Sequence, residues 1–220
     1  MPPSKATMTP KPRPKTNHSA AGPVQPLRAA QKELLLQRVH DAAREQFFKC
    51  GYHESTLDQI ATAAGVQRAT LYKHFRNKQE ILDMVAERYG DRLLEVTSTL
   101  PGPVPSRADI DGWMLRIAAF IKKERTPTVL ISGLAMSDEP EAVTQIGVRI
   151  IQRLAENVSA YRCALEPGPR QERAYAFAML IARDICWNSL RLARKGKDTL
   201  SQHFVDLTGD LAETFVREYS

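Results

Sequence analysis

The chain has 220 residues, of which 43% are hydrophobic and 25% charged, so its composition is that of a globular protein and excludes a fibrous or largely disordered one. Its net charge of +6 is unevenly distributed, because residues 1–32 hold six basic side chains and no acidic one, which leaves 25 of each sign in the remainder. A cationic segment on a neutral body is typical of nucleic-acid binding, and it also fits a solvated tail that only aids solubility.

The cysteine pattern and the hydropathy exclude several other classes. Cys50, Cys163 and Cys186 include no CxxC pair for zinc or thiol exchange, so we expect no metal site and no cofactor. The longest uninterrupted apolar run, 174–182, is much shorter than the roughly 20 residues that span a bilayer, and the N-terminus lacks the apolar region of a signal peptide. We expect a cytoplasmic protein with reduced thiols and no membrane partner.

Proline-rich segments divide the chain. Residues 1–30 contain seven of the fourteen prolines and no apolar periodicity, which predicts a disordered basic arm. From Gln31 the apolar spacing predicts a helix that ends at Gly51. Three prolines within residues 101–106 forbid a continuous helix there. The expected parts after the arm are a small unit, residues 31–100, and a larger unit, residues 106–220.

The larger unit has helical apolar spacing throughout, and no stretch alternates with the period of a strand. A long stripe from Val143 to Leu165 predicts one helix. A turn rich in proline and glycine at residues 167–169 separates it from a helix that reaches about residue 195, and a last amphipathic helix follows Asp198. The predicted fold class is all-α.

The informative segment is STLDQIATAAGVQRATLYKHF, residues 55–75. Thr56 begins a capping-box pattern that starts a short helix, and Gly65 follows that helix at a position where a tight turn needs positive φ. In the second short helix, Leu71 and Phe75 lie four residues apart and are predicted to face the core. The spacing of these elements predicts a helix-turn-helix.

With Leu71 and Phe75 inside, the polar residues of the second short helix face outward. Gln67 and Arg68 carry paired donors and acceptors that suit base edges, while Thr70 and Tyr72 offer hydroxyls to phosphate or an apolar edge to a thymine methyl. Lys78 lies in the first turn of the next helix, where free backbone amides also favour a phosphate. Such a surface suits the major groove of DNA.

At these residues the sequence resembles the tetracycline-repressor (TetR) family of bacterial transcription regulators. The resemblance covers residues 33 to about 90 and rests on the glycine after the first helix, STxDQIA, AAGV, TLYxHF and a following N-K pair, in that order. It implies an N-terminal three-helix DNA-binding unit followed by a larger helical ligand-binding and dimerisation domain. The DNA-contacting residues that it implies are Thr56, Gln67, Arg68, Thr70, Tyr72, Lys73, His74 and Lys78. Lys73 stands where many relatives have an aromatic residue, which leaves its contact open between base and phosphate.

The helix after residue 169 is unusually apolar, and the resemblance implies a homodimer through the last two helices, residues of about 170–219. Arg183 and Asp184 fit either an ion pair, at that interface or within the chain, or a polar anchor in a ligand cavity. Bulky or adaptable side chains that fit an apolar cavity, and equally plain core, are Trp113, Phe120, Met136, Ile150, Phe177, Met179 and Trp187. The expected effector is a small apolar or amphipathic molecule.

The sequence thus predicts a sequence-specific DNA-binding transcriptional regulator, a homodimeric repressor that binds an inverted-repeat operator on double-stranded DNA and is released by a small molecule. Activation in place of repression, and a DNA contact by the N-terminal arm, stay open. The alternative is a non-specific architectural nucleic-acid binder driven by the arm. An all-helical enzyme is disfavoured because the sequence has no paired-carboxylate, HExxH or glycine-rich phosphate-loop motif.

Overall fold

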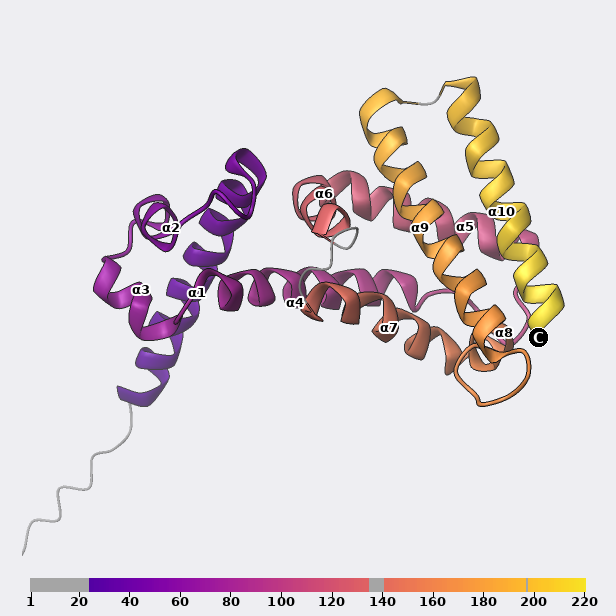
Figure 1. Cartoon of the computed structure of the whole chain (residues 1–220), viewed down its shortest axis with the longest axis horizontal. Coiled ribbons are helices and arrows are strands. Elements are labelled where there is room, and N and C mark those ends of the chain that lie inside the picture. Colours follow the sequence, from indigo (N-terminus) through magenta and orange to yellow (C-terminus); the bar gives the residue numbers. More distant parts are fainter. Residues whose placement is uncertain (1–23, 135–140, 197) are drawn as a thin grey trace, which may run out of the picture.

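The computed structural model describes residues 24–134, 141–196 and 198–220, and within these ranges the chain forms only helices (Figure 1). The predicted all-α fold class is confirmed. The helices are α1 (Val24–Cys50), α2 (Leu57–Ala64), α3 (Arg68–His74), α4 (Lys78–Thr97), α5 (Arg107–Lys123), α6 (Arg125–Leu134), α7 (Glu141–Ala155), α8 (Ser159–Cys163), α9 (Gln171–Lys195) and α10 (Thr199–Tyr219).

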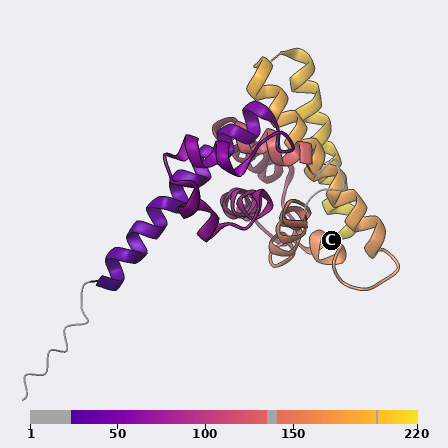
Figure 2. The ribbon, with the colours of Figure 1, turned by 60° about the vertical axis from the view of Figure 1, so that its left-hand side comes forward.

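The first helix starts earlier than the sequence pattern predicts. Residues 24–30, expected in the disordered arm, form the first turns of α1. Pro26 is compatible with helix there because it lies in the first turn, where backbone N–H groups have no acceptor within the helix. Arg28 and Lys32 are exposed on this extension, which projects beyond the rest of the N-terminal unit (Figure 2). Residues 1–23 lie outside the described residues, so a disordered arm there stays a prediction.

Helices α1, α2 and α3 and the first half of α4 enclose the smaller core. Phe47, Ile60, Leu71 and Leu82, one from each of these helices, are at most 1% exposed. Phe75 follows α3 and is 6% exposed. The predicted inward orientation of Leu71 and Phe75 is therefore confirmed, and burial of these apolar side chains supplies the stability that such short helices lack by themselves.

Helix α4 runs from the smaller core into the larger unit (Figure 1). Val85 in its first half is fully buried in the smaller core, whereas its last residue, Thr97, accepts a 2.7 Å hydrogen bond through its carbonyl from Trp113 Nε1 of α5. Leu130 and Ile131 of α6 also pack into the smaller core. The small and large units therefore share side-chain packing across the expected boundary.

In the larger unit, α9 packs against both α5 and α10, and α8 joins α7 to the same core (Figure 1). Its buried side chains include Trp113 and Ile117 of α5, Ile181 of α9 and Phe215 of α10, each at most 3% exposed. The apolar faces predicted for these helices thus meet in one core.

The proline-rich segment between α4 and α5 is held against the turn that separates α7 from α8. The Pro103 carbonyl accepts a 3.0 Å hydrogen bond from Ser159 N, and a Cβ on Gly102 would fall 1.7 Å from the Asn157 carbonyl oxygen. The single helix predicted from Val143 to Leu165 is wrong for this reason. The backbone at Ser159 bonds to the proline-rich segment, and the helix is interrupted between α7 and α8.

Candidate DNA-binding surface and ligand cavity

Three polar contacts fix the two ends of α2, two at its start and one at the turn to α3. Thr56 Oγ1 accepts from Gln59 N at 3.2 Å, and the Gln59 side chain accepts from Thr56 N at 2.9 Å, which confirms the predicted capping box. Gly65 has φ of 61° and its carbonyl accepts from Arg38 Nη2 at 2.9 Å. A Cβ at Gly65 would lie 2.6 Å from that nitrogen, so both the left-handed backbone and the close approach of Arg38 require glycine.

Helix α3 lies at the outer end of the molecule, far from α9 and α10 (Figure 1). Leu71 and Phe75 hold it to the core, and Phe75 N closes its last turn on the Leu71 carbonyl at 2.9 Å. The structure places the predicted DNA-contacting residues of this helix together on its solvent side. They are Gln67, Arg68, Tyr72, Lys73 and His74, all exposed, with Thr70 half-buried.

The two arginines on or next to α3 are exposed, and each forms an ion pair with one carboxylate. Arg68 Nε lies 3.1 Å from Asp58 Oδ1, with 68% of the Arg68 side chain exposed. Arg76 Nε lies 2.9 Å from Glu80 Oε1 and its side chain is 91% exposed. Because exposed ion pairs contribute only about 0–1 kcal/mol, a phosphate or a base edge can replace either carboxylate at small cost.

Lys78 differs from the other predicted contacts because its ammonium group is hydrogen-bonded to backbone carbonyls of the protein. Its Nζ donates to the carbonyl oxygens of Tyr52, His53 and Ser55 at 2.9, 2.5 and 3.3 Å, and it lies 4.8 Å from the centre of the Tyr52 ring. Three acceptors use all three donors of an ammonium group. In this geometry Lys78 stabilises the turn that precedes α2, and Thr56 remains exposed on that turn.

A largely apolar cavity of about 80 Å³ lies among α4, α5, α7, α8 and α9. Most of its wall is isoleucine, leucine, alanine and tryptophan. The polar side chains on the wall are Tyr89, Thr97, Tyr161 and Cys186. Burial raises the pKa of the Cys186 thiol, whose sulfur lies 3.1 Å from Ser132 Oγ, so this thiol is protonated near neutral pH.

Of the predicted cavity residues, Trp113 and Ile150 line this cavity. Phe120 is not on its wall. The Phe120 ring packs against Tyr89, with the ring centres 5.7 Å apart. Met136 lies outside the described residues.

None of the predicted cavity residues on α9 is on the cavity wall. Phe177 packs against Phe215, with ring centres 5.5 Å apart, while Arg183 is 61% exposed and lies 3.3 Å from Asp184. Met179 and Trp187 belong to a set of apolar side chains that α9 and α10 leave 39–59% exposed. This set, the α9–α10 face, consists of Met179, Leu180, Trp187, Leu200, Leu207 and Leu211.

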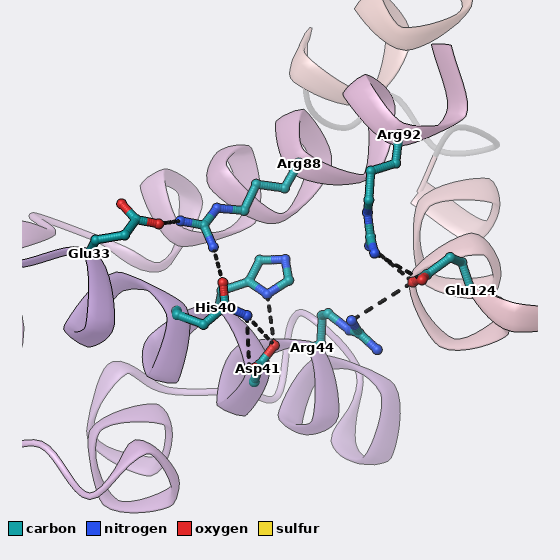
Figure 3. Close-up of polar contacts among 8 residues, drawn as sticks. Glu33, His40, Asp41, Arg44, Arg88, Arg92 and Glu124 are labelled. Atoms are coloured by element: carbon teal, nitrogen blue, oxygen red, sulfur yellow. Dashed lines mark hydrogen bonds and ion pairs between the residues drawn. The ribbon is translucent and has the colours of Figure 1, made fainter. Parts of the chain in front are cut away.

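A chain of polar contacts links the cavity wall to α1. The hydroxyls of Tyr89 and Thr128 lie 2.9 Å apart, and Thr128 Oγ1 donates to the Glu124 carbonyl at 2.7 Å. The Glu124 side chain, 8% exposed, accepts two hydrogen bonds from Arg92 at 2.9 and 3.0 Å. Arg44 of α1 approaches the same carboxylate to 3.9 Å (Figure 3). We call these five side chains the Glu124 network.

A second group of polar contacts ties α1 to α4. Arg88 of α4 donates to Glu33 at 2.9 Å and to Gln37 at 2.6 Å (Figure 3). His40, 4% exposed, has its Nδ1 3.0 Å from Asp41 Oδ1. Burial lowers the pKa of His40, and the nearby positive charge of Arg88 acts in the same direction.

The sequence analysis missed the Glu124 network and Tyr161. The sequence gives only a weak indication of the network. Glu124 follows two lysines at the end of a helix, where an exposed charge is expected, and its arginine partners lie 80 and 32 residues earlier in the chain. Within the described residues, no cluster of His, Cys, Asp or Glu is suited to hold a metal ion. No helix in the described ranges has the length and apolarity needed to cross a membrane.

Comparisons with known proteins match the N-terminal unit most strongly. Residues 39–85 match the family described as bacterial regulatory proteins, tetR family. The HTH-type transcriptional regulator SrpR of Pseudomonas putida is 49% identical over 57 residues, 26% of this chain and 27% of that protein. The HTH-type transcriptional activator FasR of Mycolicibacterium smegmatis is 32% identical over 108 residues, 49% of each protein. The chain therefore spans about a quarter to a half of the length of these relatives.

Solved structures extend the similarity of the fold to the larger unit. A tetR family transcription regulator from a Shewanella species superposes with a TM-score of 0.64 at 15% identity, over 84% of this chain and 97% of that one. A TetR-like transcriptional regulator from a Rhodococcus species gives a TM-score of 0.57 at 22% identity, over 83% and 93%. These matches support the resemblance read from the helix-turn-helix: residues 39–85 match the tetR family model, and the chain shares the fold of TetR-like regulators.

Proposed function

We propose that this protein is a sequence-specific DNA-binding transcriptional regulator. The observation that carries the proposal is α3, a helix that two buried apolar side chains hold to the core. Apart from the half-buried Thr70, its polar residues are exposed at the outer end of the molecule. A helix of this kind fits the major groove, with Gln67 and Arg68 against base edges and Tyr72, Lys73 and His74 against bases or phosphates. Thr56 adds an exposed hydroxyl to the same side, whereas Lys78 supports the surface from inside.

We further propose that the protein acts as a homodimer through the α9–α10 face. Its six apolar side chains are exposed on two helices that pack against each other, and exposed apolar side chains gathered on such a pair of helices indicate a protein partner. Arg183 is exposed and Asp184 half-buried, and neither lines the cavity, which favours the interface over the cavity as the place where this pair acts. A two-fold dimer presents two copies of α3, so the operator would be an inverted repeat with half-sites about 34–36 Å apart, or a multiple of that.

The cavity is the proposed effector site, and the Glu124 network is the proposed path from it to α1. Tyr89 lies on the cavity wall, and Arg44 lies in the helix that packs against α2. A ligand that shifts Tyr89 or α6 changes the position of Glu124 relative to Arg44, and thereby the position of the N-terminal unit. Differential affinity of the ligand for the two arrangements would release a repressor from its operator.

Selection of bound duplexes from a random pool, at near-physiological salt, tests the proposal. An enriched inverted repeat is the expected result, and its half-site spacing measures the distance between the two α3 helices. An enriched single half-site would contradict the dimer but leave base reading intact. Salt-sensitive binding without any enriched motif would overturn base reading and favour the architectural alternative, in which the exposed Arg28 and Lys32 of α1 add phosphate contacts.

A further inference from the structure

We propose that the cavity binds an uncharged, mainly apolar molecule that places one hydrogen-bonding group against the Tyr161 hydroxyl. The proposal rests on the ligand-responsive function proposed above and specifies the chemical class of the effector. It depends on three properties of the cavity: a wall without charge, polar groups that are nearly all engaged, and the hydroxyl of a buried tyrosine that has no partner among the described residues.

The wall carries no charge. Within the described part of the chain, none of the residues that line the cavity is a lysine, arginine, histidine, aspartate or glutamate. Arg92 follows Tyr89 on α4, but its guanidinium makes two hydrogen bonds to Glu124. A bound carboxylate, phosphate or ammonium group would therefore lose its hydration without gaining a countercharge, which strongly disfavours charged ligands.

Most polar groups on the wall already have partners. Thr128 donates its only hydroxyl hydrogen to the Glu124 carbonyl, so Tyr89 must donate its own to Thr128 Oγ1. Thr97 Oγ1 donates to carbonyls of its own helix, at 3.0 and 3.2 Å, and Trp113 Nε1 donates to the Thr97 carbonyl. The donors of Tyr89, Thr97 and Trp113 are therefore all used within the protein, and none of them is left to bond a ligand.

Tyr161 is the exception. Its ring is 4% exposed and packs edge-on against Phe215, with ring centres 5.0 Å apart, while its side chain forms part of the cavity wall. Its hydroxyl makes no hydrogen bond to any residue that the structure describes, and burial alone raises its pKa, so it stays protonated. A buried hydroxyl without a partner is unfavourable, and a polar group of a ligand would satisfy it as donor or acceptor.

The dimensions of the cavity select a small or slender ligand. Its volume of about 80 Å³ is below the roughly 300–1,000 Å³ of sites for drug-sized ligands. Gly147 and Ala182 on its wall are small, and Ala182 is exposed. Met179 Cε lies 3.5 Å from where a Cβ of Gly147 would be, so a flexible side chain borders the cavity at this point and permits some widening.

Calorimetric titration of the full chain with n-hexanol, n-hexane and hexanoate at neutral pH tests this assignment. We expect saturable binding of hexanol, binding of hexane about three- to tenfold weaker, and binding of hexanoate at least about a hundredfold weaker. Methyl hexanoate, which lacks the charge, should regain most of the lost affinity. Equal or tighter binding of hexanoate, or no binding of any of these probes, would overturn the proposal.

Two tyrosine variants separate the role of Tyr161 from general effects on packing. Tyr161→Phe keeps the ring against Phe215 and should abolish the preference for hexanol over hexane without weakening hexane. Tyr219→Phe is the matched control, because the Tyr219 hydroxyl is also buried without a partner but lies outside the cavity wall, and this variant should retain the preference. A preference that survives in Tyr161→Phe would contradict the assigned contact, for instance if a bound water satisfies Tyr161.

Failure of this proposal is distinguishable from failure of the proposed function. The affinity of both variants for the selected operator is measured without ligand and should equal that of the unmodified protein, because neither residue lies in the N-terminal unit. Retained operator binding with no response to neutral probes would overturn the ligand class alone. Loss of base-specific binding in the unmodified protein would overturn the function itself.

Discussion

The solvent side of α3 and the wall of the cavity place their functional side chains in opposite environments. Two buried apolar side chains attach α3 to the core and leave its polar side chains exposed to solvent, so each exposed polar residue can be substituted with little effect on folding. Around the cavity, apolar side chains surround the Tyr161 hydroxyl, which has no partner among the described residues, so a change in charge or volume there affects binding and stability together. Binding specificity and stability are thus separable in the N-terminal unit and coupled in the larger one.

The largest expected effect comes from the buried side of α3. Leu71→Ala removes a fully buried side chain and should lower the free energy of unfolding by about 2–5 kcal/mol, measured by urea denaturation. Tyr72→Ala, at the next position and 51% exposed, is the control and should lower it far less while weakening operator binding. Similar losses of stability in the two variants would contradict the division between the two sides of the helix.

Glu124→Gln tests the contact between the two units. The change removes the negative charge that Arg92 and Arg44 share, and should lower the free energy of unfolding by roughly 1.5–3 kcal/mol. It should also reduce the effect of a cavity ligand on operator affinity. Glu33→Gln is the control, because the 67% exposed Glu33 bonds to a different arginine and should change stability by about 0.5 kcal/mol or less. An unchanged ligand response in Glu124→Gln would remove the network from the proposed path.

Gly65→Ala tests the turn that orients α3. An alanine at φ of 61° is strained, and its Cβ would displace Arg38, so we expect a loss of about 1–3 kcal/mol in the free energy of unfolding. The control is Gly133→Ala in α6, where nothing lies within 4 Å of the added Cβ and the backbone is helical. That variant should be neutral or slightly stabilising. Equal effects at the two glycines would contradict the requirement for glycine in the turn.

Arg68→Ala is expected to change binding without changing stability. Loss of its guanidinium should remove about 1–3 kcal/mol of discrimination between operator and random DNA, measured as the ratio of the two dissociation constants. Arg76→Ala removes a similar exposed charge outside α3 and should weaken binding to both duplexes equally. If Arg68→Ala also weakens both equally, Arg68 contacts phosphate and another residue reads the bases.

The smallest expected effect is a pH dependence from His40. Burial lowers its pKa below the ordinary value of 6.5, so the unfolded chain binds more protons than the folded protein as the pH falls through that value. The free energy of unfolding should therefore decrease from about pH 7 to about pH 5, and His40→Gln should flatten this dependence. His53→Gln, at an exposed position, should leave it unchanged. An identical pH dependence in both variants would assign the proton uptake to another group.

The sequence predicts the helix-turn-helix well because its determinants are local. A capping box at Thr56, a glycine at 65 and two apolar residues four apart each act over one or two turns of chain, and the structure contains all three. The all-α fold class follows equally from periodicity. The neighbours of Lys78 lie more than twenty residues earlier in the chain, and its engagement with three backbone carbonyls has no local signal.

The residues that line the cavity are predicted poorly from the sequence, because the lining depends on which side of each helix packs against a neighbouring helix. Residues 174–182 of α9 are all apolar, so every side of the helix is apolar there. Phe177 and Met179, like Trp187 further along, therefore fit a cavity as well as the residues that line it, and only packing against α5 and α10 decides between them. The break between α7 and α8 has a similar origin. It depends on a hydrogen bond from Ser159 to Pro103, more than fifty residues away, while the local periodicity favours a continuous helix.

The continuity of α4 has a consequence for the cooperativity of unfolding. Its first half supplies side chains to the smaller core. Tyr89, in its second half, belongs to both the cavity wall and the Glu124 network, and its last turn is hydrogen-bonded to α5. Unfolding of either unit therefore removes packing from the other, and the chain should melt in one transition. Amide hydrogens in the middle of α4 should exchange only through global unfolding, and a cavity ligand should slow their exchange as much as that of the larger unit.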